Sequence, residues 1–147
     1  MALTTVEEQL RTAMLADPNI SPLLGTRWYI EPLPQNSAFP AVTVVRVSTI
    51  RQAMRNGNSS QTADIGWTRL QIDVWDNTDA ASAQRVSQIA QYIIDVLKTF
   101  SAYGQGARTL TGSNRVLNQQ LRAVPELQPP GYRAILDVKI WFTDKDQ

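Results

Sequence analysis

A change in hydrophobic period near the middle of the chain predicts its architecture. In residues 67–75 polar side chains alternate with three apolar ones, Leu70, Ile72 and Val74. This period of two predicts a strand with one buried face. In residues 79–100 apolar side chains recur at helical spacing instead, at Val86, Ile89, Ala90, Ile93 and Leu97. Only residues 76–79 separate the patterns, so we expect a long helix to lie across the apolar face of a sheet.

The first half of the chain predicts a helix followed by two strands. Thr5 and Glu8 have the spacing of a capping box, which begins a helix, and Pro18 disfavours helical geometry in the residue before it. The predicted elements are a helix from Thr5 to Asp17, one further helical turn at 20–25, a short strand over Arg27–Glu31 and a valine-rich strand over Pro40–Ile50. The valine-rich strand has apolar residues on both faces over part of its length. We therefore expect it in the centre of the sheet, or with one face against another subunit.

Residues 51–63 differ in character from the strands on either side. They are mostly polar, and the turn dipeptide Asn56–Gly57 lies in their middle. The simplest interpretation is an extended hairpin whose tip projects from the body. Such a tip is either a flexible loop or an arm that becomes ordered against a partner.

The remaining segments complete the predicted fold. They are a Gly- and Ser-rich connector over 101–113, a strand over Asn114–Val124, a turn over 125–131, a strand over Tyr132–Phe142 and a flexible polar tail over 143–147. Strands joined mostly by hairpins, with a helix at each break, predict an α+β domain spanning residues 1–147. We expect a mostly antiparallel sheet of about five strands, with two main helices packed on it and a protruding β-hairpin arm.

Composition narrows the possible functions. The formal net charge of +1 is too small for a broad basic surface that neutralises many phosphates. The chain has no cysteine and no histidine, which removes thiol chemistry, the commonest general base and the usual transition-metal ligands. No apolar run approaches membrane-spanning length, and the N-terminus carries acidic residues where a signal peptide needs basic ones. We expect a soluble protein made in the cytoplasm, without a cofactor.

The best catalytic candidates are aspartates. Phosphate-binding loops and Ser-x-x-Lys spacing are absent from the sequence. Carboxylates gathered at a strand end can bind Mg²⁺, and the candidates here are Asp73, Asp76 and Asp79, with Asp137 as a fourth. The alternative is structural: Asp73 lies on the polar face of its strand, whereas Asp76 and Asp79 sit where helix caps belong. We favour the structural role.

Three tryptophans fall on the mostly polar face of their predicted strands: Trp67, Trp75 and Trp141. They either pack beneath the first helix or anchor a protein interface, where aromatic and arginine side chains are enriched. An aromatic platform for single-stranded nucleic acid would need basic residues around it. Arg69 and Arg133 supply few such charges, and Asp73 and Asp137 oppose them.

Several segments resemble one family in their order and spacing. They are Leu15–Gly25 (LADPNISPLLG), Tyr29, Leu33–Gln35 (LPQ), Phe39–Val42 (FPAV), Leu70–Trp75 (LQIDVW) before a long helix, and a closing strand over 132–141. Together they resemble the small tail-completion proteins, or tail terminators, of long-tailed bacteriophages. The 51–63 arm matches this pattern least.

The resemblance implies a virion protein of the tail or neck that has no catalytic activity. Such proteins form a ring, typically a hexamer, that caps the tail tube, stops its polymerisation and offers a docking face to the head connector. The implied partners are further copies of the chain, the tube protein and the connector, while DNA only passes through the lumen. Hypothetical interface residues are Arg51, Met54, Arg55, Asn56, Asn58, Trp67, Trp75 and Trp141. Two alternatives remain: another neck or tail component, such as a head-closure or tube subunit, and a metal-dependent enzyme using the aspartates.

Overall fold

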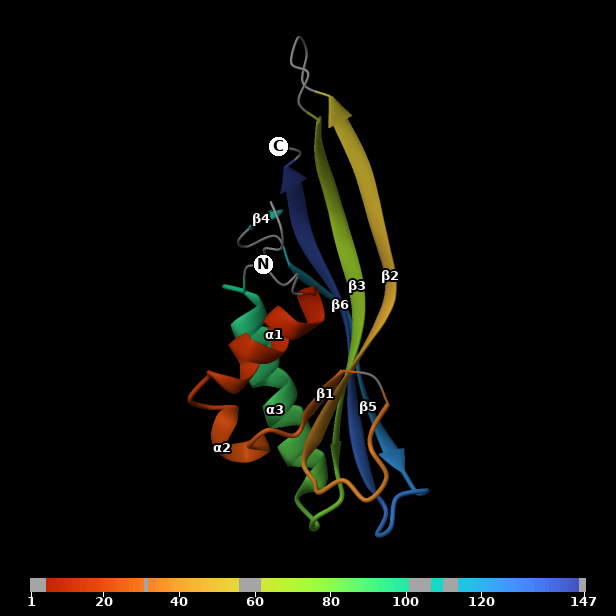
Figure 1. Cartoon of the computed structure of the whole chain (residues 1–147). Helices are drawn as coiled ribbons and strands as arrows, with labels where there is room; N and C mark the ends of the chain where they lie inside the picture. The colour runs from red at the N-terminus through yellow and green to blue at the C-terminus, as the bar shows by residue number, and fades with distance from the viewer. Residues whose placement is uncertain (1–4, 31, 56–61, 101–106, 110–113, 146–147) are drawn as a thin grey trace.

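The computed structural model describes residues 5–30, 32–55, 62–100, 107–109 and 114–145, with side chains for 5–30, 32–49, 66–100 and 114–141. The elements along the chain are α1 (Val6–Leu15), α2 (Ser21–Leu24), β1 (Trp28–Ile30), β2 (Ala41–Arg55), β3 (Thr62–Asp76), α3 (Ser82–Leu97), β4 (Ala107–Thr109), β5 (Arg115–Val124) and β6 (Gly131–Lys145). The strands form a single sheet beside the helices (Figure 1).

The six strands are arranged in the order β1, β2, β3, β6, with β4 and β5 both paired to the other edge of β6. Among the strands that the structure describes, only β1 runs parallel to its neighbour, and the other pairings are antiparallel. The predicted α+β fold with a mostly antiparallel sheet is therefore confirmed. The sheet has one strand more than expected, because β4 lies inside the segment predicted as a connector.

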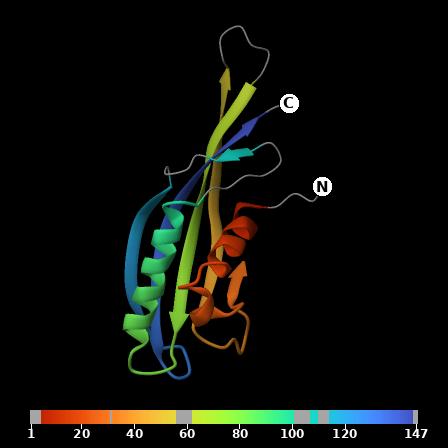
Figure 2. The same cartoon turned by 90° about the vertical axis from the view of Figure 1, so that its left-hand side faces the viewer.

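The helices cover one face of the sheet and bury the core against it (Figure 2). All five apolar residues of the predicted α3 stripe are buried, and they meet the inward side chains of β2, β3 and β6. Helix α1 begins at the predicted capping box, in which the Glu8 amide donates to Thr5 Oγ1 over 3.1 Å and the Thr5 amide donates to Glu8 Oε2 over 3.3 Å. The change of hydrophobic period between residues 67–75 and 79–100 thus correctly predicted that a helix packs on the apolar face of the sheet.

An ion pair fixes α1 on the sheet. Glu7, which is buried, accepts from Arg46 of β2 through Nε at 3.1 Å and Nη2 at 2.6 Å. Arg46 is therefore on the helix-bearing side of β2, together with Val42 and Val44 of the core.

Strand β2 continues five residues beyond its predicted end at Ile50 and contains a bulge between Arg46 and Ser48. Before the bulge Val45 is exposed on the side opposite the core, and Val47 at the bulge is exposed as well. This accounts for the apolar residues on both faces of the sequence pattern. Antiparallel pairing between β2 and β3 continues to Arg55 and Thr62, and the hairpin extends well beyond the helices (Figure 1).

Strand β6 also exceeds its predicted length. It continues to Lys145, with Thr143, Asp144 and Lys145 paired to β3. The prediction of a flexible polar tail over 143–147 is therefore wrong for residues 143–145. The backbone of a long β3 provides hydrogen-bonding groups for this segment, and polar side chains do not prevent such pairing.

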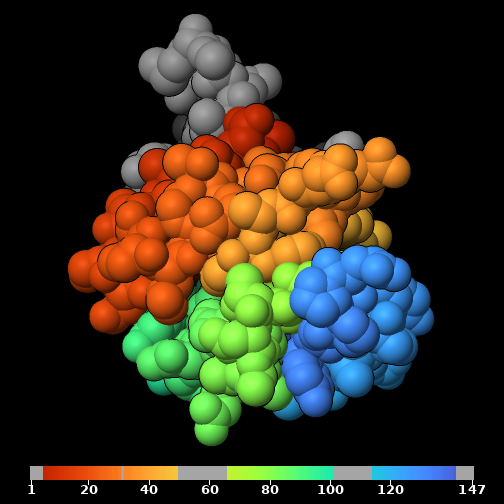
Figure 3. Space-filling model, turned by 90° about the horizontal axis from the view of Figure 1, so that it is seen from below, coloured from red at the N-terminus to blue at the C-terminus, as the bar shows by residue number. Residues whose placement is uncertain are grey.

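Three connections meet at the end of the molecule opposite the hairpin: residues 32–40, 77–81 and 125–130 (Figure 3). The Asn77 side chain donates to the carbonyl of Pro129 over 3.0 Å. At Gly131 an added Cβ would lie 2.2 Å from the carbonyl oxygen of Asp76, so only glycine allows this approach of β6 to the end of β3.

Candidate functional site

The face of the sheet opposite the helices is the most distinctive surface of the described structure. We call it the uncovered face, because no helix of the described part of the chain lies on it (Figure 1). Its two central rows are Trp67, Arg69, Gln71, Asp73 and Trp75 on β3 and Arg133, Ile135, Asp137, Lys139 and Trp141 on β6. The alternating side chains of β3 and β6 are buried in the core, so strand geometry directs these rows away from it.

An aromatic pair with a cation lies at the hairpin end of the uncovered face. Trp67 and Trp141 are register partners, and their ring centroids are 4.9 Å apart with a 50° angle between the ring planes. The Lys139 Nζ lies 4.1 Å from the Trp67 ring and 4.5 Å from the Trp141 ring. The cluster presents partly buried indole area together with a positive charge, a combination enriched at protein interfaces.

A two-pronged ion pair lies in the middle of the face. Arg69 donates from Nε to Asp137 Oδ1 over 2.9 Å and from Nη2 to Asp137 Oδ2 over 2.5 Å. This hydrogen bonding to Asp137 raises the pKa of Arg69. Both partners are therefore held in one orientation across the two strands.

A third group lies near the loop end. Trp75 donates from Nε1 to Thr43 Oγ1 over 3.0 Å, and the Arg133 guanidinium lies 4.9 Å from the Trp75 ring centre. Asp73 accepts from the Gln71 amide at 3.2 and 3.1 Å, and Arg133 Nη1 is 3.9 Å from its carboxylate. Burial raises the pKa of Asp73, although the hydrogen bond from Gln71 and the charge of Arg133 oppose that shift.

A concavity of about 330 Å³ spans the uncovered face from β2 to β5. It is lined by Val47, Arg69, Gln71, Asn118, Gln120, Arg122, Arg133, Ile135 and Asp137. The contribution of β5 was missed from the sequence. The sequence carries a signal for it in the alternating polar side chains at 118, 120 and 122.

The four candidate metal ligands do not form one site. Asp73 lies on the uncovered face, whereas Asp76 at the end of β3 is fully buried and is bound by Arg85 of α3. Arg85 also pairs with Asp79 over 2.9 Å, and this hydrogen bond is the main cause of the lowered pKa of Asp79. Within the described ranges no three acidic side chains converge as metal ligands. The structure therefore does not bring Asp73, Asp76 and Asp79 together in the way that the metal-site alternative requires.

The prediction that Asp76 or Asp79 caps the second helix is also wrong. Helix α3 begins at Ser82 after Ala81, and no side chain caps its first turn. The carboxylates pair with Arg85 instead, and Asp79 additionally accepts from the Ala81 amide over 2.8 Å. Both carboxylates bind the Arg85 guanidinium, and this ion pairing takes the place of helix capping.

The predicted interface residues fall into three groups. Trp67, Trp75 and Trp141 lie on the uncovered face, and none of them packs beneath α1; the buried tryptophan on the helix side is Trp28, whose carbonyl accepts from Arg11 over 3.0 Å. Three others lie on β2, where only their backbone is described: Arg51, Met54 and Arg55. Asn56 and Asn58 lie outside the described residues.

Comparison with known proteins gives the family. The sequence model described as "Tail completion protein gp17" matches residues 8–143, so the chain belongs to the gp17 tail completion family. Among solved structures, a chain in the virion of a native gene transfer agent (GTA) particle matches with a TM-score of 0.64 at 17% sequence identity, over 94% of each chain. That likeness shows a shared fold. Curated proteins gave no significant match.

Family membership settles the class of protein. The chain is a structural protein of a phage tail, located in the tail or neck of the virion, and it contacts other tail and head components. The predicted resemblance to tail-completion proteins is therefore confirmed. Separately, no helix in the described ranges is long and apolar enough to cross a membrane.

Proposed function

We propose that this protein is a non-enzymatic tail terminator. Copies of it, in a ring that is typically a hexamer, cap the tail tube, stop its polymerisation and provide the docking face for the head connector. Membership of the tail completion family supports this proposal. The partners are then further copies of the chain, the tube protein and the connector protein, while DNA passes through the lumen.

The observation that carries the proposal is the difference between the two ends of the molecule. A long β2–β3 hairpin extends beyond the helices at one end, and three connections gather at the other (Figures 1 and 3). A ring built from head-to-tail contacts has two different faces, because every copy points the same way along the ring axis. Such a ring can present hairpins to one partner and loops to the other.

The hairpin arm and the three outward tryptophans are the proposed contact residues. Backbone pairing between β2 and β3 up to Arg55 and Thr62 supports an arm that reaches a neighbouring copy or the tube. On the uncovered face, Lys139 over the Trp67–Trp141 pair supports an interface role for these aromatic residues.

A catalytic role has little support in the site. Each candidate carboxylate that sequence analysis selected is engaged by an arginine of the same chain: Asp73 near Arg133, Asp76 and Asp79 by Arg85, and Asp137 by Arg69. Carboxylates held in this way stabilise the fold and are poorly placed to bind a substrate or a metal ion.

Electron microscopy of tails from a phage with this gene inactivated tests the proposal. Headless tails of abnormal or uncontrolled length are expected, because a terminator combines length control with head joining. Tails of normal length without heads would instead indicate a head-closure role. Complete infectious particles would overturn the proposal.

A further inference from the structure

Most of the large apolar side chains that are exposed lie on strands at the two edges of the sheet. Among the described residues six such side chains are exposed, and five of them are Ile30 on β1, Val45 and Val47 on β2, and Leu117 and Leu121 on β5, with exposed fractions from 36% to 53%. Natural edge strands usually carry charged residues or proline, which discourage pairing with another chain. Aliphatic residues on both edges of one sheet therefore indicate surfaces that become covered.

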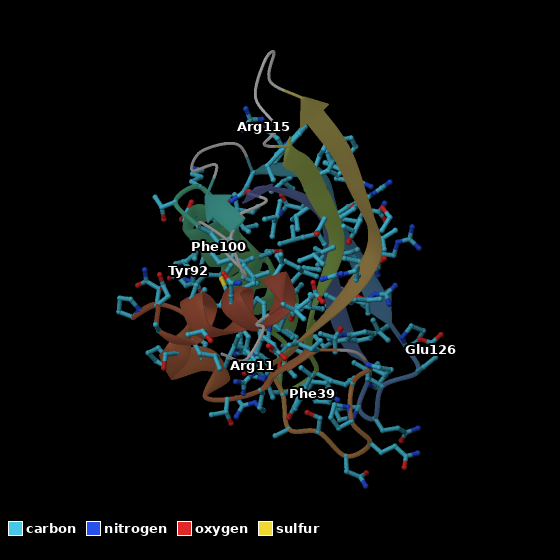
Figure 4. All side chains as sticks on the ribbon, turned by 45° about the horizontal axis from the view of Figure 1, so that its top comes forward. Arg11, Phe39, Tyr92, Phe100, Arg115 and Glu126 are labelled. Atoms are coloured by element: carbon cyan, nitrogen blue, oxygen red, sulfur yellow. The ribbon has the colours of Figure 1, made fainter. Side chains whose placement is uncertain are left out.

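Both edges also offer backbone hydrogen-bonding groups. In the described part of the chain β5 pairs only with β6, and β2 beyond Val44 pairs only with β3. We call these the β5 edge and the β2 edge; the β2 edge includes β1. In Figure 4, Arg115 is the first residue of β5, and Glu126 lies two residues after its last residue, Val124.

Each edge has a bulge, and the extra residue in each bulge is aliphatic. Val47 is the unpaired residue in β2, and Leu117 is the unpaired residue in β5. A bulge normally hinders pairing at an edge and re-aims a side chain. Here the re-aimed side chains are large, apolar and about half exposed, so they add contact area to the edges.

Leu117 on the β5 edge lies at the same level along the strands as Val45 and Val47, and Leu121 lies two residues from the level of Ile30. The β5 bulge lies between two rows of paired residues that cross the sheet from β6 through β3 to β2. One row is Asp137, Gln71 and Val45, and the other is Val138, Leu70 and Arg46. Leu117 is therefore level with Val45 and Val47. The row of paired residues that begins at Leu121 crosses the sheet through Ala134, Val74 and Val42 to Trp28 on β1. Trp28 is two residues before Ile30 on the same strand.

The strand directions are also compatible. Strand β5 runs antiparallel to β6, β6 antiparallel to β3, and β3 antiparallel to β2, so β5 and β2 run in opposite directions. When a second copy is rotated about an axis along the strands, its β2 edge meets the β5 edge of the first in an antiparallel arrangement. Antiparallel ladders are the more stable kind.

We propose that copies of this chain join with the β5 edge of one against the β2 edge of the next. Leu117 then contacts Val45 and Val47 of the neighbouring copy, and Leu121 contacts Ile30. The contact uses two different surfaces, so it propagates in one direction and closes into a ring when the rotation permits. This inference rests on the proposed ring and names the surfaces that build it.

Cysteine cross-linking tests the contact in a chain that has no cysteine of its own. The test variant carries Val47→Cys and Leu117→Cys together. Within one copy these positions are separated by three strand spacings, about 14 Å, which is too far for a disulfide. Oxidation of tails assembled with this variant should give a ladder of covalent oligomers that ends at the ring number and collapses on reduction.

Control variants separate this contact from others. Each single variant should remain monomeric after oxidation, and Leu117→Cys combined with Gln84→Cys on α3 should give no ladder. Complete rings or tails that yield no Val47–Leu117 cross-link would overturn the inference while leaving the terminator function intact. Efficient dimers from one single variant would also overturn it, since they require like-to-like contact.

A charge substitution gives a second readout that needs no oxidation. Leu117→Lys places an ammonium on the edge, which should reduce ring or tail yield at least tenfold while the thermal unfolding of the monomer stays unchanged. Gln84→Lys adds the same charge to an exposed helix position and should leave the yield unaltered. Equal yields from both variants would contradict the proposed contact.

Discussion

Trp67 and Trp141 face each other from β3 and β6 on the uncovered face, with ring centroids 4.9 Å apart and Lys139 above both rings. The contact is made by register partners, so strand pairing alone brings the rings together. A tilted aromatic pair contributes about 0.5–1.5 kcal/mol beyond the apolar area it buries.

A double-mutant cycle should detect this coupling. Trp67→Ala and Trp141→Ala should each lower the free energy of unfolding, and the double variant should lose about 0.5–1.5 kcal/mol less than the sum of the two. Urea denaturation of the four proteins measures these values. Strictly additive losses would mean that the rings do not interact in solution.

Removing the Arg85 side chain should destabilise the fold strongly. Arg85 binds the fully buried carboxylate of Asp76, and a buried charge left without its partner costs about 3–5 kcal/mol. We expect Arg85→Ala to lower the free energy of unfolding by about 3 kcal/mol, measured by urea denaturation. Arg122→Ala on the uncovered face is the matched control and should stay within about 0.5 kcal/mol of the native chain. Similar losses in the two variants would contradict a special role for Arg85.

The raised pKa of Asp73 predicts a pH-dependent effect. A carboxyl group whose pKa is higher in the folded state binds more protons there, so it lowers stability as pH rises above the ordinary value of 3.8. Asp73→Asn removes this titration. The stability of the variant relative to the native chain should therefore increase from pH 3 to pH 7, in denaturation experiments at both values. A constant difference between the two proteins would show that the pKa of Asp73 is not raised.

Short-range sequence patterns predicted the elements whose formation depends on neighbouring residues. The capping box at Thr5, the stripe of α3 and the alternation in β3 and β6 each follow from short-range spacing, and each is present in the structure. The outward placement of Trp67 and Trp141 followed from the same alternation.

Features that depend on contacts between distant segments were not predictable in this way. Strand β4 has three residues, too few for a periodic signal, and the parallel pairing of β1 is a property of the assembled sheet. The bulge at Leu117 shifts the alternation of β5 and conceals its polar row. Arg85 lies nine residues after Asp76, and only the path of α3 brings the two together.

Gly131 should be among the least replaceable residues of the chain. Its added Cβ would meet the Asp76 carbonyl oxygen at 2.2 Å, and neither backbone can yield without disturbing the β3–β6 pairing. We expect Gly131→Ala to cost about 2 kcal/mol or more, by analogy with overpacked sites. Gly25→Ala is the comparison: Gly25 has φ +59°, but its added Cβ would meet only Arg27 Nη1, at an ordinary contact distance of 3.7 Å, so the cost should be about 1–2 kcal/mol from backbone strain. A Gly131→Ala protein as stable as the native one would refute the close approach.

The hairpin arm offers the sharpest test of the division between folding and assembly. Replacing residues 56–61 by a two-residue Asn-Gly turn should retain the pairing that runs to Arg55 and Thr62, since this dipeptide favours tight hairpins. The core lies beneath the helices, away from the arm, so the midpoint of thermal unfolding should not change. Tail or ring assembly should fail if the arm contacts the next copy or the tube. Circular dichroism measures the first outcome and electron microscopy of tails the second; normal virions from this variant would remove the arm from the interface.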